Sequence, residues 1–152
     1  MKNLKKVLAL VLVVAMMASF AVSAGAASFT DNAKIVYNDA VKLLSNLDVI
    51  NGFTDGSFNP EGNVTRAQTA KMIAYIMNGG EDASSTFAAS AKFNDVANGY
   101  WAANSIGYCA TKEIVAGAGN NLYYPNNDVT GVQLAKMALV ALGYDPTIEG
   151  LT

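Results

Sequence analysis

One arginine stands among the ten basic residues of this 152-residue chain; the other nine are lysines, and histidine is absent. This residue, Arg66, follows Thr65 in the stretch NVTRAQTAKM, in the first turn of a predicted helix. A helix N-terminus already carries partial positive charge, so a guanidinium there is unfavourable on its own. Free backbone amides and a guanidinium together can bind a carboxylate or a phosphate. Two interpretations therefore stay open for Arg66: a charge that faces solvent, or one part of an anion site.

Two T-x-x-Q spacings predict where helices begin. Thr65 with Gln68, and Thr130 with Gln133, have the spacing of a capping box. In that motif the threonine hydroxyl and the glutamine side chain each accept a hydrogen bond from a free amide at the helix start. Helix capping accounts for these four residues without any ligand. It leaves the arginine unexplained, and the second copy carries Gly131 in its place.

The residue types argue against an enzyme. Without histidine there is no imidazole base or metal ligand, and no two carboxylates have a spacing that suggests acid–base catalysis. The one cysteine, Cys109, lies in an apolar helical stretch and is predicted to be a small buried side chain. We therefore predict a non-catalytic protein with no cofactor and no metal. A calcium loop around Asp55, Asn59 and Glu61 is a weaker alternative, because the closing glutamate of such loops is missing.

The first 26 residues have the features of a secretory signal peptide. Lysines precede an apolar run from Val7 to Val22, which is shorter than a spanning helix requires, and Ala24 and Ala26 fit a cleavage site. An uncleaved membrane anchor is the alternative. The remaining chain has seven basic and twelve acidic residues, a net charge of about −5. We therefore predict an exported protein that binds no nucleic acid and has no stable membrane insertion after cleavage.

The rest of the chain consists of two copies of one unit. Leu47 to Met77 aligns without a gap on Lys112 to Leu142, at a constant offset of 65. Both copies contain an aromatic-x-Pro sequence, T-x-x-Q and AKM, and F-x-D motifs at Phe29 and Phe93 precede them. Such self-similarity indicates a repeat architecture.

Hydrophobic periodicity predicts two helices in each unit. In the first unit, apolar side chains recur every three to four residues from Ala33 to Leu47 and from Thr65 to about Met77. The glycines and proline of NGFTDGSFNPEGN predict a loop between them. The predicted organisation is a signal peptide (1–26), a first repeat (28–79), a linker (80–92), a second repeat (93–143) and the start of a third (144–152).

One helix-loop-helix unit of this size cannot bury its apolar stripe alone. The predicted fold class is therefore mainly α, with tandem helix-loop-helix repeats packing on one another. The last residues, GYDPTIEGLT, lie where a third unit would follow. We expect either a truncated reading frame or the front of a longer protein.

These motifs resemble the S-layer homology (SLH) repeats of bacterial cell-surface proteins. The resemblance rests on the F-x-D motifs, on YW at Tyr100–Trp101, and on INGFTDGSFNP followed by VTRAQ. It covers residues 29–77 and 93–143. It implies a pseudo-threefold helical bundle that binds secondary cell-wall polysaccharide, often pyruvylated, without covalent attachment. The implied location is the cell wall or surface layer of a Gram-positive-type bacterium.

The resemblance also implies ligand-binding residues. Arg66 would pair with the pyruvyl carboxylate, and Gly52, Asp55 and Gly56 would form the ligand loop. Trp101 would either stack on a sugar ring or pack in the core, and both interpretations stay open. The implied partners are the polysaccharide, other SLH repeats and surface-layer subunits. Alternative functions are a structural, wall-proximal part of a surface-layer subunit and the targeting module of a longer exported enzyme.

Three departures from the family pattern bear on ligand binding. Gln68 replaces the usual glutamate, which preserves capping but removes a charge. Gly131 replaces the arginine in the second copy, and Val36 stands in the first copy where the second has Trp101. The two copies are therefore not expected to bind ligand equally.

Overall fold

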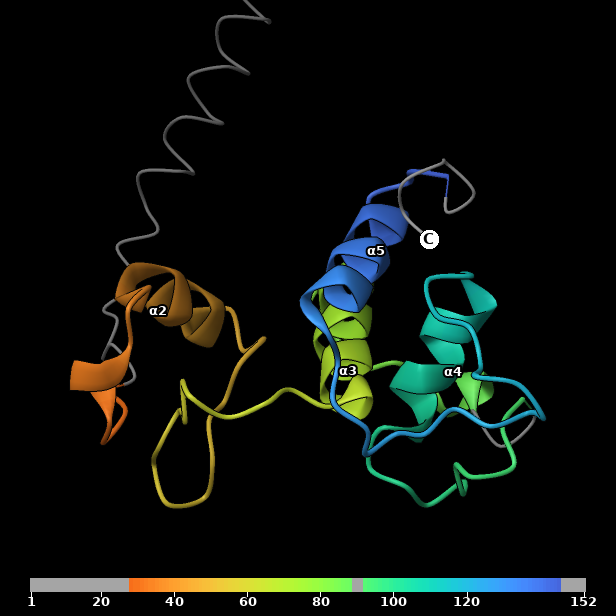
Figure 1. Ribbon diagram of the computed structural model, residues 1–152, viewed down its shortest axis with the longest axis horizontal. Helices are drawn as coiled ribbons and strands as arrows, with labels where there is room; N and C mark the ends of the chain where they lie inside the picture. Colours follow the sequence, from red (N-terminus) through yellow and green to blue (C-terminus); the bar gives the residue numbers. More distant parts are fainter. Residues whose placement is uncertain (1–27, 89–91, 146–152) are drawn as a thin grey trace, which may run out of the picture.

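The computed structural model describes residues 28–88 and 92–145 (Figure 1). Over these residues the regular secondary structure is helical, and the one β-bridge, between Thr65 and Asp128, belongs to no strand. The mainly α prediction is confirmed. The α-helices are α2 (Asn38–Asn46), α3 (Arg66–Met77), α4 (Ala103–Thr111) and α5 (Gly131–Ala141), with two 3-10 turns, η1 (Asn32–Lys34) and η2 (Ser85–Phe87).

The predicted signal peptide and residues 146–152 of the predicted start of a third repeat lie outside the described residues. Among the helices that the structure does describe, none combines the length and the apolar character needed to cross a membrane.

Both predicted capping boxes are present and set the start of α3 and of α5. The Thr65 hydroxyl accepts from the Gln68 amide at 3.3 Å, and the Gln68 side chain accepts from the Thr65 amide at 2.8 Å. Thr130 and Gln133 repeat this pair at 3.2 and 3.0 Å. Each threonine is in an extended conformation directly before its helix. The T-x-x-Q spacing therefore predicted both helix starts correctly.

The predicted first helix, 33–47, is interrupted and does not run as one element. Ile35 takes an extended conformation after η1, and α2 begins only at Asn38. The break lets Ile35 pack in a small cluster with Phe29 and Val41. Across it, the Asn38 side chain donates to Asn32 Oδ1 at 2.7 Å. Burial of one isoleucine thus overrides the helical periodicity.

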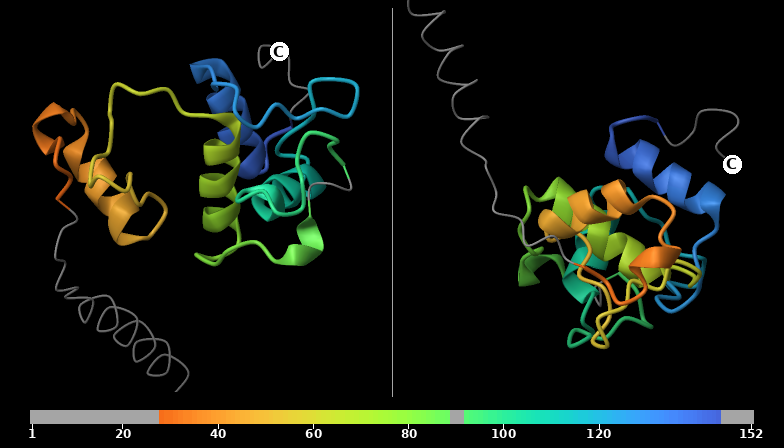
Figure 2. Two further views of the ribbon diagram at one scale, coloured as in Figure 1. Left: turned by 90° about the horizontal axis from the view of Figure 1, so that it is seen from below. Right: turned by 90° about the vertical axis from the view of Figure 1, so that its left-hand side faces the viewer.

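The larger core joins the second helix of one unit to the first helix of the next. Helix α3 packs on α4 and α5, and α4 packs on η2 (Figures 1 and 2). Three fully buried alanines, Ala67, Ala70 and Ala74, form the contact face of α3. Cys109 is fully buried in this core, as predicted. The two units therefore interlock rather than fold as independent hairpins.

Helix α2 and the predicted linker differ in how they contact the larger core. Helix α2 and η1 lie apart from the body formed by α3, α4 and α5 in Figure 1 and in the left view of Figure 2. This part of the chain carries the separate cluster of Phe29, Ile35 and Val41, with Phe58 against it. Within the predicted linker, Phe87 of η2 stacks edge-on against Tyr108 of α4, with ring centroids 5.1 Å apart.

Candidate functional site

The aspartate of each F-x-D motif holds the loop that precedes the second helix of its unit. Asp31 accepts from the Phe58 and Asn59 amides at 2.9 and 2.7 Å. Asp95 accepts from the corresponding amides of Tyr123 and Tyr124 at 2.8 and 2.7 Å. The hydrogen bond from the Phe58 backbone amide is the main cause that lowers the pKa of Asp31. These motif residues therefore build the loop.

Gly52 is required by the packing of the same loop. Its φ is +68°, and a Cβ there would lie 2.5 Å from the Phe29 ring and 2.7 Å from the Ser57 carbonyl oxygen. Gly117, its counterpart, approaches Phe93 in the same way. Gly56, with φ of +80°, closes the loop tip, where its carbonyl accepts from the Thr30 amide at 3.0 Å. A side chain at position 52 is excluded by steric contact.

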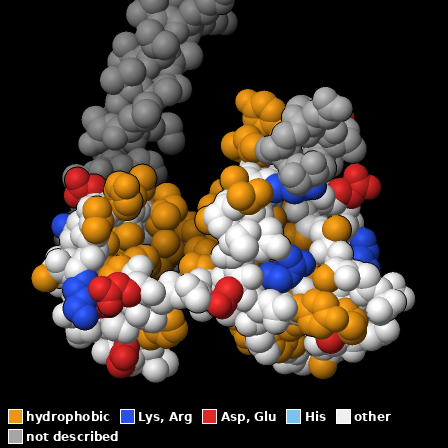
Figure 3. All heavy atoms as spheres, in the orientation of Figure 1, with side chains coloured by type: hydrophobic (Ala, Val, Ile, Leu, Met, Phe, Trp, Pro, Cys, Tyr) orange, Lys and Arg blue, Asp and Glu red, His pale blue; other side chains and the backbone are white. Residues whose placement is uncertain are grey.

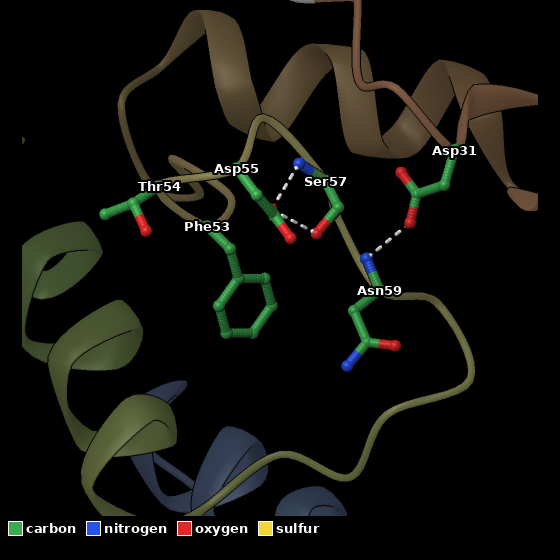
Figure 4. Close-up of a pocket in the computed structure, with 6 residues that line it drawn as sticks. All are labelled: Asp31, Phe53, Thr54, Asp55, Ser57 and Asn59. Atoms are coloured by element: carbon green, nitrogen blue, oxygen red, sulfur yellow. Dashed lines mark hydrogen bonds between the residues drawn. The ribbon is translucent and has the colours of Figure 1, made fainter.

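Asp55 lies at the tip of this loop and faces a shallow polar hollow of about 430 Å³ (Figure 4). Its carboxylate accepts from the Ser57 hydroxyl at 2.7 Å and from the Ser57 amide at 2.9 Å, and both bonds lower its pKa. Over the residues that the structure describes, no three His, Cys, Asp or Glu side chains come together as a metal would require. The carboxylate of Asp55 serves an Asx-type turn.

Arg66 is engaged with the second unit. Its Nε donates to the Tyr123 carbonyl at 2.8 Å, and Nη2 donates to the Ala116 carbonyl at 3.0 Å. The guanidinium lies 4.4 Å from the centroid of the Tyr123 ring, a cation–π distance. In return the Tyr123 hydroxyl donates to the Arg66 carbonyl at 3.0 Å. The carbonyl oxygens of the second unit occupy two donors of the guanidinium.

The amides in the first turn of α3 are engaged as well. The Arg66 amide donates to the Asn127 carbonyl and the Ala67 amide to the Pro125 carbonyl, both at 2.9 Å, while the Gln68 amide binds the capping threonine. The electropositive helix end is therefore covered by the turn before α5. This contact explains how the helix tolerates an arginine at its first position.

An apolar groove of about 460 Å³ lies between the loop of the first unit and the start of the three-helix body. Trp101, at the turn before α4, forms one side of it and is 57% exposed. Phe53, from the loop, lines the groove and is 49% exposed. Core packing of Trp101 is thus the wrong interpretation. Large aromatic rings held in an open groove can stack on the apolar face of a ring-shaped ligand.

Three side chains of α3 complete the groove, two of them polar. Gln68, Lys71 and Met72 line it, and the Lys71 ammonium forms an ion pair with Asp82. The Asp82 side chain is 70% exposed, so this pair is weak. The Lys71 ammonium can therefore exchange Asp82 for another carboxylate at little cost.

The groove brings together two of the five predicted ligand residues. Gly52 and Trp101 line it. Asp55 faces the neighbouring hollow, Gly56 closes the loop tip, and the Arg66 side chain points to the second unit. Sequence reasoning missed Phe53 and Lys71. An aromatic residue beside the loop glycine was a usable signal for Phe53, whereas nothing distinguishes Lys71 from the other lysines.

Comparison with known families identifies both units. The S-layer homology domain family matches residues 28–70 and 92–135. The first matched segment ends within α3 and the second ends within α5.

Three relatives illustrate where such segments occur. A surface layer protein of Brevibacillus choshinensis is 30% identical over 153 residues, which is 99% of this chain and 14% of that protein. Exoglucanase XynX of Acetivibrio thermocellus is 32% identical over 103 residues, 68% of this chain and 9% of that protein. A cellulosome-anchoring protein of the same species is 29% identical over 86 residues, 57% of this chain and 19% of that protein. The chain spans less than a fifth of these relatives.

Proposed function

Because this chain belongs to the S-layer homology family and is a cell-surface anchoring module, we propose that it anchors by binding a secondary cell-wall polysaccharide non-covalently in the Trp101 groove. The observation that carries the proposal is the pairing of two half-exposed aromatic side chains, Trp101 and Phe53, across one open groove. Sugar rings have apolar faces that stack on aromatic rings and hydroxyls that bond to polar side chains. Gln68 and Asn63 supply such polar groups at the groove.

A pyruvylated sugar adds a carboxylate, and we propose Lys71 as its first partner. Lys71 lies in the groove and has only an exposed ion pair to give up. Arg66 is the second candidate, but it already donates two hydrogen bonds and stacks on Tyr123. A guanidinium has five donors, so Arg66 can add a contact from the remaining ones. Its larger contribution is to hold the second unit against α3.

The anchored cargo is part of the same proposal. The module is located at the cell wall or surface layer, and its relatives include a surface layer protein and an exoglucanase. Because the chain spans so little of these proteins, we propose that it serves as the wall-proximal module of a larger exported protein. That protein can be a surface-layer subunit or an enzyme without any change in the anchoring chemistry.

Co-sedimentation with purified cell-wall sacculi tests the proposal. The chain without its signal peptide should sediment with intact sacculi and remain in solution once their polysaccharide has been stripped chemically. Trp101→Ala and Lys71→Gln should each weaken sedimentation about tenfold or more, as expected for loss of a stacking or charge-assisted contact.

Val36→Ala is the matched control. Val36 occupies the position of Trp101 in the first unit and is 85% exposed, yet it does not line the groove. It should leave sedimentation unchanged. Equal sedimentation with stripped and intact sacculi would refute polysaccharide binding.

A further inference from the structure

Trp101 forms one side of the groove, but more than half of its own surface meets no other protein group. Hydrophobic side chains are visible where the part formed by η1, α2 and the first loop meets the body of α3, α4 and α5 (Figure 3). An exposed side chain exchanges between rotamers within nanoseconds, and immobilising it on binding costs entropy. A neighbour that restricts the indole beforehand therefore strengthens binding of a ligand that stacks on it.

Tyr100 is the neighbour in a position to restrict the indole. The centroid of its ring lies 5.7 Å from that of Trp101, at an interplanar angle of 45°, a favourable distance for an aromatic pair. Tyr100 packs against the larger core. Its amide donates to the Ala97 carbonyl and its carbonyl accepts from the Ala103 amide, both at 2.9 Å. The backbone of Tyr100 is therefore held on both sides.

A hydrogen bond within the second unit holds the outer end of the Tyr100 ring. The Tyr100 hydroxyl donates to Asn126 Oδ1 at 3.0 Å. Asn126 lies in the turn before α5, and the carbonyl of the next residue, Asn127, accepts from the Arg66 amide at the start of α3. The turn that braces Tyr100 is thus itself fixed to the helix whose side chains line the groove.

The first unit shows that the fold does not need this brace. At the offset of 65 that relates α2 to α4, the counterparts of Tyr100, Trp101 and Asn126 are Ile35, Val36 and Glu61. Ile35 is 8% exposed and packs in its own cluster, so an aliphatic side chain satisfies packing at this position. The aromatic ring, its hydroxyl and the amide acceptor occur together only in the unit that carries the tryptophan.

We propose that Tyr100 is a positioning residue of the groove: anchored by Asn126, it holds the Trp101 indole in the orientation that stacks on a sugar ring. This inference rests on the proposed polysaccharide binding. The freedom of the indole is nevertheless a property of the chain alone, so it can be measured without any ligand.

Time-resolved fluorescence anisotropy of the chain without its signal peptide measures this freedom, because Trp101 is the only tryptophan. Tyr100→Phe keeps the ring and Asn126→Ala removes the acceptor, so each should raise the amplitude of the fast depolarisation about twofold or more. The two changes combined should have no larger effect than either one, since they remove the same hydrogen bond. Asn126→Asp keeps an acceptor oxygen and should restore most of the wild-type signal. Unchanged amplitudes in both single variants would overturn the proposal.

Stability separates positioning from a structural role of the same hydrogen bond. That bond is exposed, so Tyr100→Phe should melt close to the wild-type temperature although its indole is more mobile. Tyr124→Phe, at an exposed tyrosine of the same turn region, is the matched control and should change neither quantity. A mobile indole that appears only together with a lowered melting temperature would contradict a positioning role.

Calorimetric titration with wall polysaccharide released from sacculi tests the consequence for binding. Tyr100→Phe should weaken binding about threefold or more, the cost of immobilising one side chain, and Tyr124→Phe should bind as the wild type does. No binding by the wild-type chain would refute the proposed function. Wild-type binding together with an unweakened Tyr100→Phe variant would overturn the positioning role alone.

Discussion

At the scale of single residues, Arg66 joins the two repeats, and its contact with a ligand remains a proposal. Its side chain meets two backbone carbonyls and the Tyr123 ring of the second unit. Two acceptors for the guanidinium are present within the protein itself, the carbonyl oxygens of Tyr123 and Ala116. Sequence reasoning identified the residue that needed an explanation. It could not supply this one, because backbone carbonyls 50 to 57 positions away leave no signal in residue types.

Arg66→Ala should lower the free energy of unfolding by about 1–3 kcal/mol, because it removes two hydrogen bonds and a cation–π contact. Arg66→Lys should recover little, since a lysine cannot form the planar two-carbonyl contact. Urea unfolding followed by circular dichroism measures both. Unchanged stability together with lost wall binding would instead assign the side chain to the ligand.

Asp31 makes the stability of the first unit sensitive to acid. Its pKa in the folded chain lies below the ordinary 3.8, so its stabilising effect is present at neutral pH and is lost as the pH falls through the folded pKa. Asp31→Asn should therefore lower the melting temperature at pH 7, and its difference from the wild type should shrink below about pH 4. Glu61→Gln, at an exposed position, is the control. If the difference in melting temperature between the variant and the wild type stayed constant with pH, the stabilising effect of the hydrogen bonds to Asp31 would not depend on its charge.

At the scale of elements, the two capping boxes and the break at Ile35 mark how far the sequence predicts this fold. Capping depends on four consecutive residues, so both helix starts could be read directly. The break in the first helix depends on where Phe29 and Val41 lie in space. Likewise, periodicity indicates which face of α3 is apolar but not that α4 of the other unit covers it. The Trp101 groove was out of reach for the same reason, because it joins the loop of one unit to the turn before α4 of the next.

Gly52→Ala tests the packing of the loop between α2 and α3. It should destabilise the chain by more than about 1 kcal/mol, since it adds a left-handed φ penalty and a clash with the Phe29 ring. Gly79→Ala is a matched control, because Gly79 has φ of +75° with nothing within 4 Å of its Cβ position. The difference between the two melting temperatures isolates the clash. Equal costs would mean that the loop relaxes around the methyl group.

At the scale of the whole molecule, the chain is a three-helix body with a smaller lobe formed by η1, α2 and the first loop (Figure 1). The groove lies where the two meet, and its lining includes Phe53 from the lobe and Trp101 from the body. Interlocking of the units is thus what creates the proposed binding surface. Neither repeat alone carries both Phe53 and Trp101.

The most direct test uses Trp101 itself, which is the only tryptophan in the chain. Its fluorescence should change saturably when wall polysaccharide released from sacculi is titrated into the chain without its signal peptide. The change should weaken when the pyruvyl groups are removed beforehand, and Phe53→Ala should raise the concentration needed. Binding to sacculi with no change in Trp101 emission would place the ligand elsewhere and contradict the account.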